Sequence, residues 1–508
     1  MDMQDLPKCC IRSAQIRRSG NLLYAKRQYR DAMEKYNQSI CSAPNDSADL
    51  DIGFANRSAV YYEQCDYKMA LANIALVRKH IYPEQLMPKL VIRETNCRAK
   101  LEEIDRNGSA SKHQSLTFNL EANPTIPFLA KGISARKHPV FGTSMVAERD
   151  FKAGNVILQE KPMQVSVCHR NLFTNCNHCF SENLLHLIPC PNCTSAMFCD
   201  ADCMRHGLKI HRFECGVTAN LSEQNDYWIG PRLFFRGLTL FDDDIQKMMA
   251  FCKACKQTER RFTDLDYMNY NPLEEFKMFL TCSLRLRTKP VINNILHLNA
   301  MICFMVYMQV PLVKSLICDE TVKYFTLKCF LELMIQDKGL SIQQEHNCRL
   351  YPVASGFSHS CDPNTLLLDY GGQLKLIVLR PIRRGAQVLI SHGPLCSQEP
   401  EERQIRLDAL QFHCRCNFCD EEKHRKWLAK LNRRCRIVPA HLEIVQRLLT
   451  GAEFCNADKL NALQQFVQRY SWTHPHNHFD IYLEAYRVVL NVCYQNEMTA
   501  AMRQKIAR

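Results

Sequence analysis

Eight cysteine and histidine side chains fall within forty residues near the middle of the chain, and this segment constrains the fold more than any other. They follow the pattern C-x2-C-x10-C-x2-C-x5-C-x3-C-x7-H-x3-C and are Cys176, Cys179, Cys190, Cys193, Cys199, Cys203, His211 and Cys215. Thiolates and imidazole are ligands that zinc prefers, and eight of them suit two tetrahedral ions. A segment this short buries too little apolar surface to fold alone, so we expect metal binding to supply its folding free energy.

The composition indicates a large folded protein with several domains. The chain has 508 residues, which is longer than a domain with one hydrophobic core normally is. Apolar residues make up 46% of the chain, which is enough to form several cores. Lys and Arg exceed Asp and Glu by 65 to 52, a moderate excess that leaves nucleic-acid binding open without requiring it. The first residues lack an apolar signal core, and the most apolar run, 298–313, is short for a bilayer. We therefore expect no membrane association, and we expect the 28 cysteines to be reduced inside the cell.

Residues 1–105 predict paired helices with an internal repeat. Small and large side chains alternate from Gly20 through Tyr36, and a second copy of this rhythm begins near Ser58, 38 residues after Gly20. Small residues allow the two helices of a hairpin to approach, and large ones fill the groove between them. The segment resembles tetratricopeptide repeats, and an ordinary antiparallel helix bundle is the alternative.

Changes in composition divide the rest of the chain. Turn-forming types predict a linker, short apolar runs between glycine turns predict strands, and amphipathic patterns predict helices. Residues 365–379 are typical of a hairpin that turns at Gly371 and Gly372. The expected divisions are helical repeats at 1–105, a linker at 106–127, strands at 128–175, the eight-ligand segment at 176–215, helices at 216–340, strands at 341–396, a cysteine-rich segment at 397–420 and helices at 421–508.

Two further motifs lie downstream of the eight-ligand segment. Residues 358–364 read Ser-His-Ser-Cys-Asp-Pro-Asn, and Cys414, Cys416 and Cys419 form a C-x-C-x2-C group, a spacing typical of zinc sites. The ligand spacing of residues 176–215 matches the MYND zinc finger throughout. With predicted strands on both sides of this finger and helical repeats ahead of it, the chain resembles the SET and MYND domain-containing (SMYD) lysine methyltransferases.

The resemblance covers about residues 130–420 by motif and the whole chain by layout, and it implies an α+β multidomain fold. Tetratricopeptide-like helical repeats would precede a β-rich SET domain that is split by the MYND finger and a helical insert. A post-SET zinc cluster and a C-terminal helical domain would follow. Three zinc ions are implied, held by Cys176, Cys179, Cys199 and Cys203; by Cys190, Cys193, His211 and Cys215; and by Cys361, Cys414, Cys416 and Cys419.

The implied activity is the transfer of a methyl group from S-adenosylmethionine to a lysine amine of a histone or another protein. Cofactor contacts would come from Gly142, Ser358, His359 and Phe412, and the substrate lysine would lie near His392 as the catalytic residue. The amine must be neutral to attack, although the pKa of a free lysine is about 10.4. A narrow apolar channel helps because it disfavours the ammonium form, and positioning supplies much of the remainder.

The chain departs from the family pattern at several site positions. Ser144 replaces the second glycine of the cofactor loop, and Ser358 replaces an asparagine. His392 and Leu410 stand where the family has two channel tyrosines. Those hydroxyls orient the amine, and the loss of one oriented donor typically costs about 100-fold in rate. These replacements support a second hypothesis, a catalytically weakened adaptor that recruits transcriptional corepressors or chaperones.

Expectations about partners and location also follow from the resemblance. MYND fingers typically bind proline-rich peptides, but the tryptophan that often helps is Leu208 here. We expect protein partners at the repeats and the finger, and a distribution between nucleus and cytoplasm. The run from His474 to His478 has no cysteine or carboxylate at ligand spacing and is interpreted as a loop.

Overall fold

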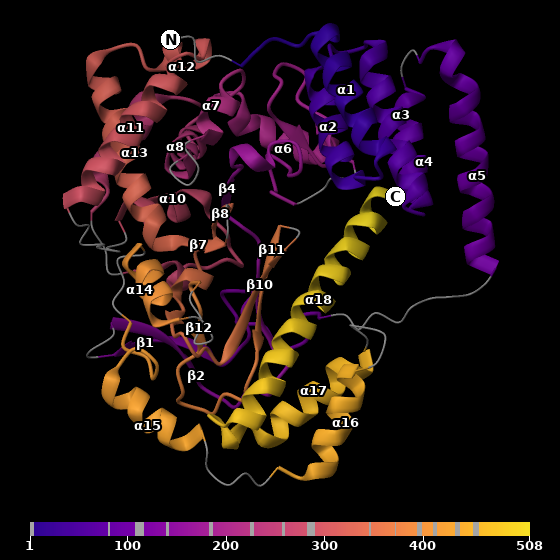
Figure 1. Ribbon diagram of the computed structural model, residues 1–508. Helices are drawn as coiled ribbons and strands as arrows, with labels where there is room; N and C mark the ends of the chain where they lie inside the picture. The colour runs from indigo at the N-terminus through magenta and orange to yellow at the C-terminus, as the bar shows by residue number, and fades with distance from the viewer. Residues whose placement is uncertain are drawn as a thin grey trace.

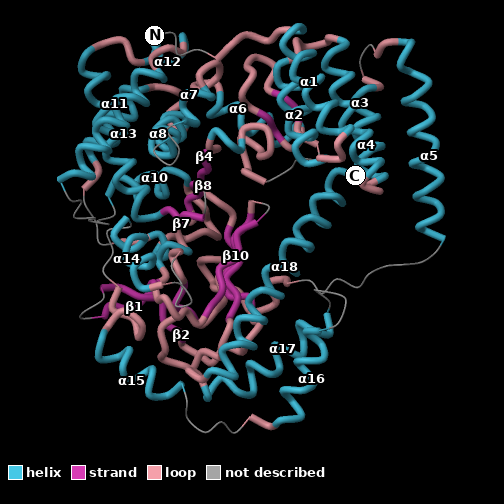
Figure 2. The backbone as a smooth tube through the Cα atoms, viewed as in Figure 1, coloured by secondary structure: helices cyan, strands magenta, loops and turns pink. Residues whose placement is uncertain are grey.

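Helices surround a central group of strands in the computed structural model (Figure 1, Figure 2). The structure describes residues 5–79, 82–106, 116–138, 142–181, 186–223, 228–256, 260–281, 290–344, 347–370, 372–393, 399–409, 414–431, 437–450 and 457–507. Within these ranges no helix is long and apolar enough to cross a membrane. The molecule combines helices and strands in several structural units.

The first four helices form two antiparallel hairpins with closely similar turns. Arg27 and Cys65 both take left-handed backbone angles, with φ of 59° and 58°, just after the first helix of each pair. Two tyrosine rings pack 5.8 Å apart beside each turn: Tyr24 with Tyr29, and Tyr62 with Tyr67. The helices are α1 (Cys10–Ala25), α2 (Tyr29–Ser42), α3 (Ala48–Glu63) and α4 (Tyr67–Val77), followed by the 3-10 turn η1 (Glu84–Leu86) and by α5 (Met87–Arg106).

Two glycines allow these helices to touch. A Cβ atom at Gly20 of α1 would lie 2.7 Å from Cε1 of the buried Tyr36 on α2. A Cβ atom at Gly53 of α3 would lie 2.5 Å from Cγ1 of Ile40, also on α2. Neither distance is sterically allowed, so α1 and α3 pack against α2 at these points because the two positions carry no side chain.

Strands from two distant parts of the chain pair with one another. β3 (Val156–Glu160) lies antiparallel to β11 (Gln373–Val378), whose other neighbour is β10 (Thr365–Tyr370). The β10–β11 hairpin expected from the sequence is confirmed, and Gly372 in its turn has a φ of 75°, which favours glycine. The other strands are β1 (Ile133–His138), β2 (Gly142–Ala147), β4 (Gln164–Ser166), β5 (Ile188–Pro189), β6 (Met197–Phe198), β7 (Ser341–Gln344), β8 (Asn347–Leu350), β9 (Ser358–His359) and β12 (Leu389–Ile390).

These long-range pairings bury a shared apolar core. Ile157 and Leu158 of β3 pack in the same cluster as Leu376 of β11 and Ile390 of β12. All four side chains are buried, and full burial of a side chain of this size contributes about 1.5–3 kcal/mol. The core therefore holds strands from residues 133–160 and from residues 365–390 together across the intervening finger and helices.

A buried polar network joins the finger to the helices that follow it. Glu214 and Arg232 form an ion pair at 3.0 Å with almost no exposed side-chain surface. Tyr307 donates a hydrogen bond to Glu214 (2.9 Å), and Arg232 donates one to the carbonyl of Val165 in β4 (2.7 Å). These hydrogen bonds offset part of the cost of removing the ion pair from water. The helices are α6 (Ala201–His211), α7 (Thr218–Glu223), α8 (Ile229–Thr239), α9 (Ile245–Ala254), α10 (Pro272–Thr281), α11 (Pro290–Tyr307), α12 (Pro311–Leu316) and α13 (Glu320–Leu340).

The C-terminal helices cover the β10–β11 hairpin. Phe466 of α17 and Tyr486 of α18 belong to the same buried cluster as Ile377 of β11. α18 then continues past the strands, and its far end lies beside α4 (Figure 1). The helices are α14 (Pro400–Ala409), α15 (Glu421–Leu431), α16 (Pro439–Thr450), α17 (Ala457–Tyr470) and α18 (Asn477–Ala507), with the short turn η6 (Ser471–Thr473) between the last two.

Part of the segment expected to be a linker packs against the core instead. Leu116 and Ile126 are buried. The carbonyl of Leu116 accepts a hydrogen bond from the buried amine of Lys375 (2.6 Å), and its amide donates to Glu497 (3.0 Å). The polar composition of residues 106–127 predicts a linker, but Leu116 in this segment forms hydrogen bonds to both β11 and α18.

A buried arginine fixes the N-terminal helices to the finger. The Arg57 side chain donates hydrogen bonds to the amide oxygens of Asn73 (2.8 Å) and Asn37 (2.9 Å) and to the carbonyl of Leu187 (2.6 Å) in the finger segment. Burial lowers the pKa of Arg57 to about 10. The cost of burying the charge is offset by these three acceptors, which lie on two helices and on the finger.

We expect Arg57→Ala to destabilise this joint by about 3 kcal/mol, because it removes a hydrogen-bond donor from the buried oxygens of Asn37, Asn73 and Leu187 and leaves a cavity. Hydrogen-exchange mass spectrometry across a urea series would measure the midpoint at which α1 to α4 lose protection. Arg98→Ala is the matched control, because Arg98 is exposed and forms a surface ion pair with Glu94 four residues away. That variant should remain within about 0.5 kcal/mol of the wild type. Equal midpoints for the two variants would contradict the assignment.

Candidate metal centres and catalytic site

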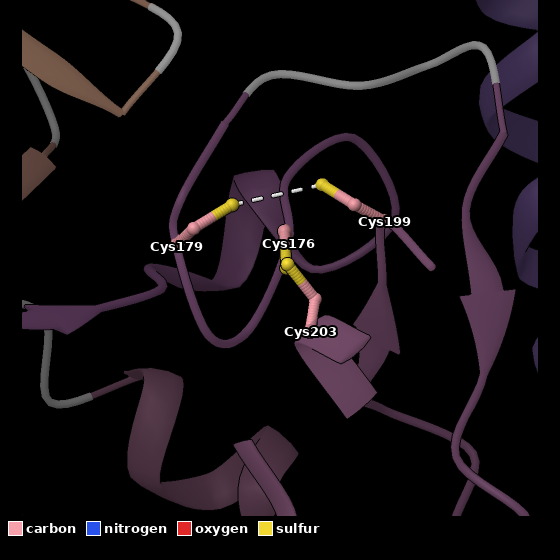
Figure 3. A group of neighbouring side chains, drawn as sticks. All are labelled: Cys176, Cys179, Cys199 and Cys203. Carbon is pink, nitrogen blue, oxygen red and sulfur yellow. Dashed lines mark hydrogen bonds between the residues drawn. The ribbon is translucent and has the colours of Figure 1, made fainter. Parts of the chain in front are cut away.

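The finger gathers its eight ligands into two interleaved groups. Figure 3 shows the first, Cys176, Cys179, Cys199 and Cys203, and the second is Cys190, Cys193, His211 and Cys215. Within each group the ligand atoms all lie within 4.8 Å of one another. Helix α6 supplies one ligand to each group, and it starts where the Asp200 side chain accepts a hydrogen bond from the amide of Cys203 (2.7 Å). The Asp200 cap therefore sets the position of both helical ligands.

A third group forms between distant segments. Cys361, Cys414, Cys416 and Cys419 also have all their sulfur atoms within 4.8 Å of one another. Sulfur atoms around a tetrahedral zinc ion at about 2.3 Å lie about 3.8 Å apart. The observed separations of 3.6 Å between Cys361 and Cys419, 3.6 Å between Cys179 and Cys199, and 3.9 Å between Cys190 and Cys215 agree with that geometry. All three groups fit zinc in donor type, number and spacing.

The segment that carries Cys361 lies beside the strand that precedes His392. β9 and β12 pair in parallel, with Ser358 opposite Leu389 and His359 opposite Ile390. The Asn364 side chain ties the two segments again, since it donates to the carbonyl of Gln387 (2.8 Å) and accepts from the amide of Leu389 (2.8 Å). The two motifs that looked separate in the sequence therefore form one unit.

His359 and His392 lie side by side in this unit, with ring centres 5.9 Å apart. The backbone amide of His392 donates to Nδ1 of His359 (3.1 Å), and Nε2 of His392 lies 3.3 Å from the carbonyl of Phe357. Burial lowers the pKa of His392, and burial together with the neighbouring His392 lowers the pKa of His359 to about 4. Both imidazoles are therefore neutral at physiological pH. Because a carbonyl only accepts, Nε2 of His392 carries the proton and Nδ1 keeps a lone pair.

Some of the other residues predicted to bind the cofactor or to line the channel lie near this unit, and others lie outside the described residues. Gly142 begins β2, and the buried Ser144 on the same strand accepts a hydrogen bond from the Gln387 side chain (3.1 Å). β2 also lies against the short turn η5 (Ala354–Gly356) that precedes β9. Phe412 and Leu410 lie outside the described residues. Gly142, Ser358, His359 and His392 thus come from strands and turns that contact one another.

Two tyrosines near the motifs do not take the place of the missing channel hydroxyls. Tyr351 is fully buried, and its hydroxyl donates to the Asp369 carboxylate (2.8 Å). Tyr370 packs at the rim of the cluster between β10 and α18. Both side chains therefore serve the packing of the β10 region.

Sequence reasoning missed a buried glutamate that holds the turn before β9. Glu160 ends β3 and accepts hydrogen bonds from the backbone amides of Val353 (3.0 Å) and Ala354 (2.8 Å). Burial raises its pKa to about 8, although the two amides favour the charged form. No local spacing marks this contact, because β3 and η5 are separated by the finger and its following helices.

The histidine run interpreted as a loop contains a second missed residue. Nε2 of His474 lies 2.9 Å from Asp362, next to the metal ligand Cys361, and Nδ1 lies 2.7 Å from Asp480 of α18. Burial and the nearby Arg380 oppose the charged form, but the hydrogen bonds to the two carboxylates outweigh them and raise the pKa of His474. The imidazolium donates to both sides and connects the Cys361 turn to α18.

Removal of metal should unfold the finger and open the Cys361 turn, because thiolate–metal bonds supply the folding free energy there. Native mass spectrometry of the purified chain should find three zinc ions. Cys361→Ser should lower the count to two by removing the third group. Cys97→Ser, a substitution of a buried cysteine outside the three groups, should leave three. A wild-type count below three would contradict the assignment.

The contact between His474 and the two carboxylates should make stability depend on pH. A pKa raised in the folded state adds stability that is fully present below the unfolded value of about 6.5 and is lost as pH rises through the folded value. We therefore expect the difference in thermal midpoint between wild type and His474→Gln to be largest near pH 6 and to shrink as pH rises. Calorimetry from pH 6 to 9 measures it, and His478→Gln, at an exposed position, should show no such trend. A pH-independent difference would contradict the charge assignment.

Comparisons with known proteins identify the finger and a set of distant relatives. Residues 176–215 match the model of the MYND finger. The chain is 22% identical to the protein-lysine N-methyltransferase SMYD4 of Danio rerio over 81% of its own length and 65% of that protein. It is 23% identical to the histone-lysine N-methyltransferase ASHR1 of Arabidopsis thaliana (55% of this chain, 53% of that protein) and 24% identical to the histone-lysine N-methyltransferase SMYD3 of Homo sapiens (55% and 60%).

The chain thus spans slightly less than two thirds of the length of the Danio rerio relative, at 65%. The finger is matched by a family model, and the Cys361 group adds a third candidate zinc site. The similarity to the Danio rerio relative extends over 81% of the chain. The chain is therefore similar, at 22% identity over 81% of its length, to proteins of the SET and MYND domain-containing family.

Proposed function

We propose that the chain is a protein-lysine N-methyltransferase that uses S-adenosylmethionine. Residues 128–175 and 341–396 would form the two parts of one SET domain, and residues 397–420 would hold the zinc cluster that closes it. The observation that carries the proposal is the parallel pairing of β9 with β12, which joins the segment of Cys361 to the strand before His392. Relatives with matching segments are named protein-lysine and histone-lysine N-methyltransferases.

The charge state of the site suits a cationic cofactor. S-adenosylmethionine supplies a methyl group on a positively charged sulfonium. The neighbouring imidazoles of His359 and His392 are neutral because burial lowers their pKa values, so they do not repel that charge. Gly142 would allow the cofactor close to the backbone, Ser358 would donate one hydrogen bond, and Phe412 would lie against the adenine.

His392 would orient the lysine amine in place of a tyrosine. Its Nε2–H is engaged by the carbonyl of Phe357, which leaves the Nδ1 lone pair to accept a hydrogen bond from the amine. Burial of the amine beside this ring would favour the neutral amine over the ammonium, because removal from water disfavours the charged form. This contact aligns the amine for in-line attack on the methyl group, and alignment is a large part of the rate enhancement for such a transfer.

The N-terminal helices and the finger would supply protein contacts. Helices α1 to α4 are proposed to be tetratricopeptide-like repeats, since their two hairpins share turn geometry and tyrosine pairs. Such repeats and MYND fingers both bind protein segments. We propose that these regions select the substrate protein or a regulatory partner, while the SET region performs the transfer.

We expect zinc-loaded protein to bind S-adenosylmethionine and to transfer a methyl group to proteins in a mixture. Isothermal titration measures the first step, and transfer of a tritiated methyl group measures the second. His392→Ala should lower the transfer rate by about 100-fold with little change in cofactor affinity, because it removes an acceptor for the amine alone. His441→Ala is the matched control, since His441 hydrogen-bonds Tyr470 in the C-terminal helices (2.6 Å).

These measurements distinguish the two hypotheses raised by the sequence, an active methyltransferase and an adaptor. Cofactor binding without transfer in the wild type would support the adaptor and contradict the enzyme. No binding by protein that carries three zinc ions would contradict both the enzyme and the cofactor site. Equal rates for His392→Ala and the wild type would remove the assigned role of His392.

A further inference from the structure

The His359 imidazole contacts the candidate metal ligand Cys361 through one nitrogen and the backbone of His392 through the other. Its Nδ1 accepts the backbone amide of His392 (3.1 Å), and its Nε2 lies 3.4 Å from the sulfur of Cys361. The ring is buried, with 9% of its surface exposed, so these contacts form away from bulk solvent. One ring therefore links two parts of the site.

The direction of each hydrogen bond follows from the first one. A backbone amide only donates, so Nδ1 of His359 must offer a lone pair and carries no proton. The proton of the neutral ring is then on Nε2, and that N–H points to the Cys361 sulfur. A zinc-bound cysteine is a thiolate, which accepts such a bond, and donors of this kind orient metal ligands and increase metal retention.

The same segment holds His392 at a second point. The carbonyl of Phe357, two residues before His359, lies 3.3 Å from Nε2 of His392. The backbone of His392 is thus held by the His359 ring and its side chain by the Phe357 carbonyl. Any shift of Cys361 that moves the His359 ring would be transmitted to the amide of His392.

We propose that His359 is a positioning residue whose side chain couples metal retention at the Cys361 group to the placement of His392. In this proposal the His359 side chain contacts Cys361 and the backbone of His392. Only the backbone of His359 would contact the cofactor. The part of the inference that concerns catalysis rests on the proposed methyl transfer; the link between metal and strand does not.

Two substitutions separate the two contacts. In His359→Asn, the amide oxygen lies where Nδ1 was and can still accept from His392, but no donor reaches Cys361. In His359→Gln, the longer amide can donate near the Nε2 position, but the acceptor for His392 is lost. A purely structural role for the ring would not make these variants differ in opposite directions.

Metal retention is the first readout. Zinc-loaded proteins are challenged with a chelator, and the loss of the third ion is followed by native mass spectrometry, with Cys361→Ser as the two-zinc reference. We expect release from His359→Asn to be about 10- to 100-fold faster than from wild type, and release from His359→Gln to remain close to wild type. Retention of the two finger ions reports that each variant is folded.

Hydrogen exchange at the His392 amide is the second readout, by mass spectrometry with electron-transfer fragmentation. We expect exchange to be about 10-fold faster in His359→Gln, which has lost the acceptor, and close to wild type in His359→Asn. Equal release and equal exchange in the two variants would overturn the inference. A different result is that the wild type transfers no methyl group while His359→Asn still releases zinc faster and His359→Gln still exchanges the His392 amide faster. That result would contradict the proposed function but would support the link between the Cys361 group and His392.

Discussion

Metal–thiolate bonding at Cys361 is the constraint on which the geometry of the site depends. Cys361 lies in the turn after β9, while its three partner cysteines follow α14, so the metal closes a loop between segments that share no sheet. Next to Cys361, β9 and β12 pair in parallel, and Asn364 adds two further hydrogen bonds between the two segments. The same turn is held from the opposite side by His474, through Asp362. Metal, strand pairing and the C-terminal helices thus act on one short stretch of chain.

The finger acts as a joint between the other parts of the molecule. Arg57 binds it to the N-terminal helices through the carbonyl of Leu187, and Glu214 binds it to the following helices through Arg232 and Tyr307. Zinc ligands of the finger also share an apolar cluster with α2, α3 and α4. A module that depends on metal for its own folding therefore transmits this dependence to the units that pack on it. In this arrangement part of the finger surface serves contacts within the chain.

The proposed replacement of a channel tyrosine by His392 would change the electrostatics of the site less than the change of residue type suggests. A charged imidazole would repel a sulfonium, but burial lowers the pKa of His392 despite the opposing effect of the Phe357 carbonyl, so the ring is neutral. The contact with this carbonyl places the proton on Nε2 and leaves a lone pair on Nδ1. A neutral histidine can then accept from an amine as a tyrosine oxygen does, at a different distance from the backbone. The proposed activity depends on this neutrality.

The sequence by itself determined the features set by local spacing. Eleven of the twelve candidate metal ligands, the β10–β11 hairpin and the helical character of the insert follow from residues close together in the chain, where spacing and side-chain type suffice. The twelfth ligand, Cys361, is expected from the family resemblance, because it lies far along the chain from Cys414, Cys416 and Cys419. Only the tertiary structure decided that β3 pairs with β11, that Leu116 packs against Lys375, and that His474 lies between Asp362 and Asp480. It also decided that the ring of His359 faces a sulfur atom and a backbone amide. Such contacts join segments far apart in the chain, and the packing of whole elements, which no local pattern encodes, brings them together.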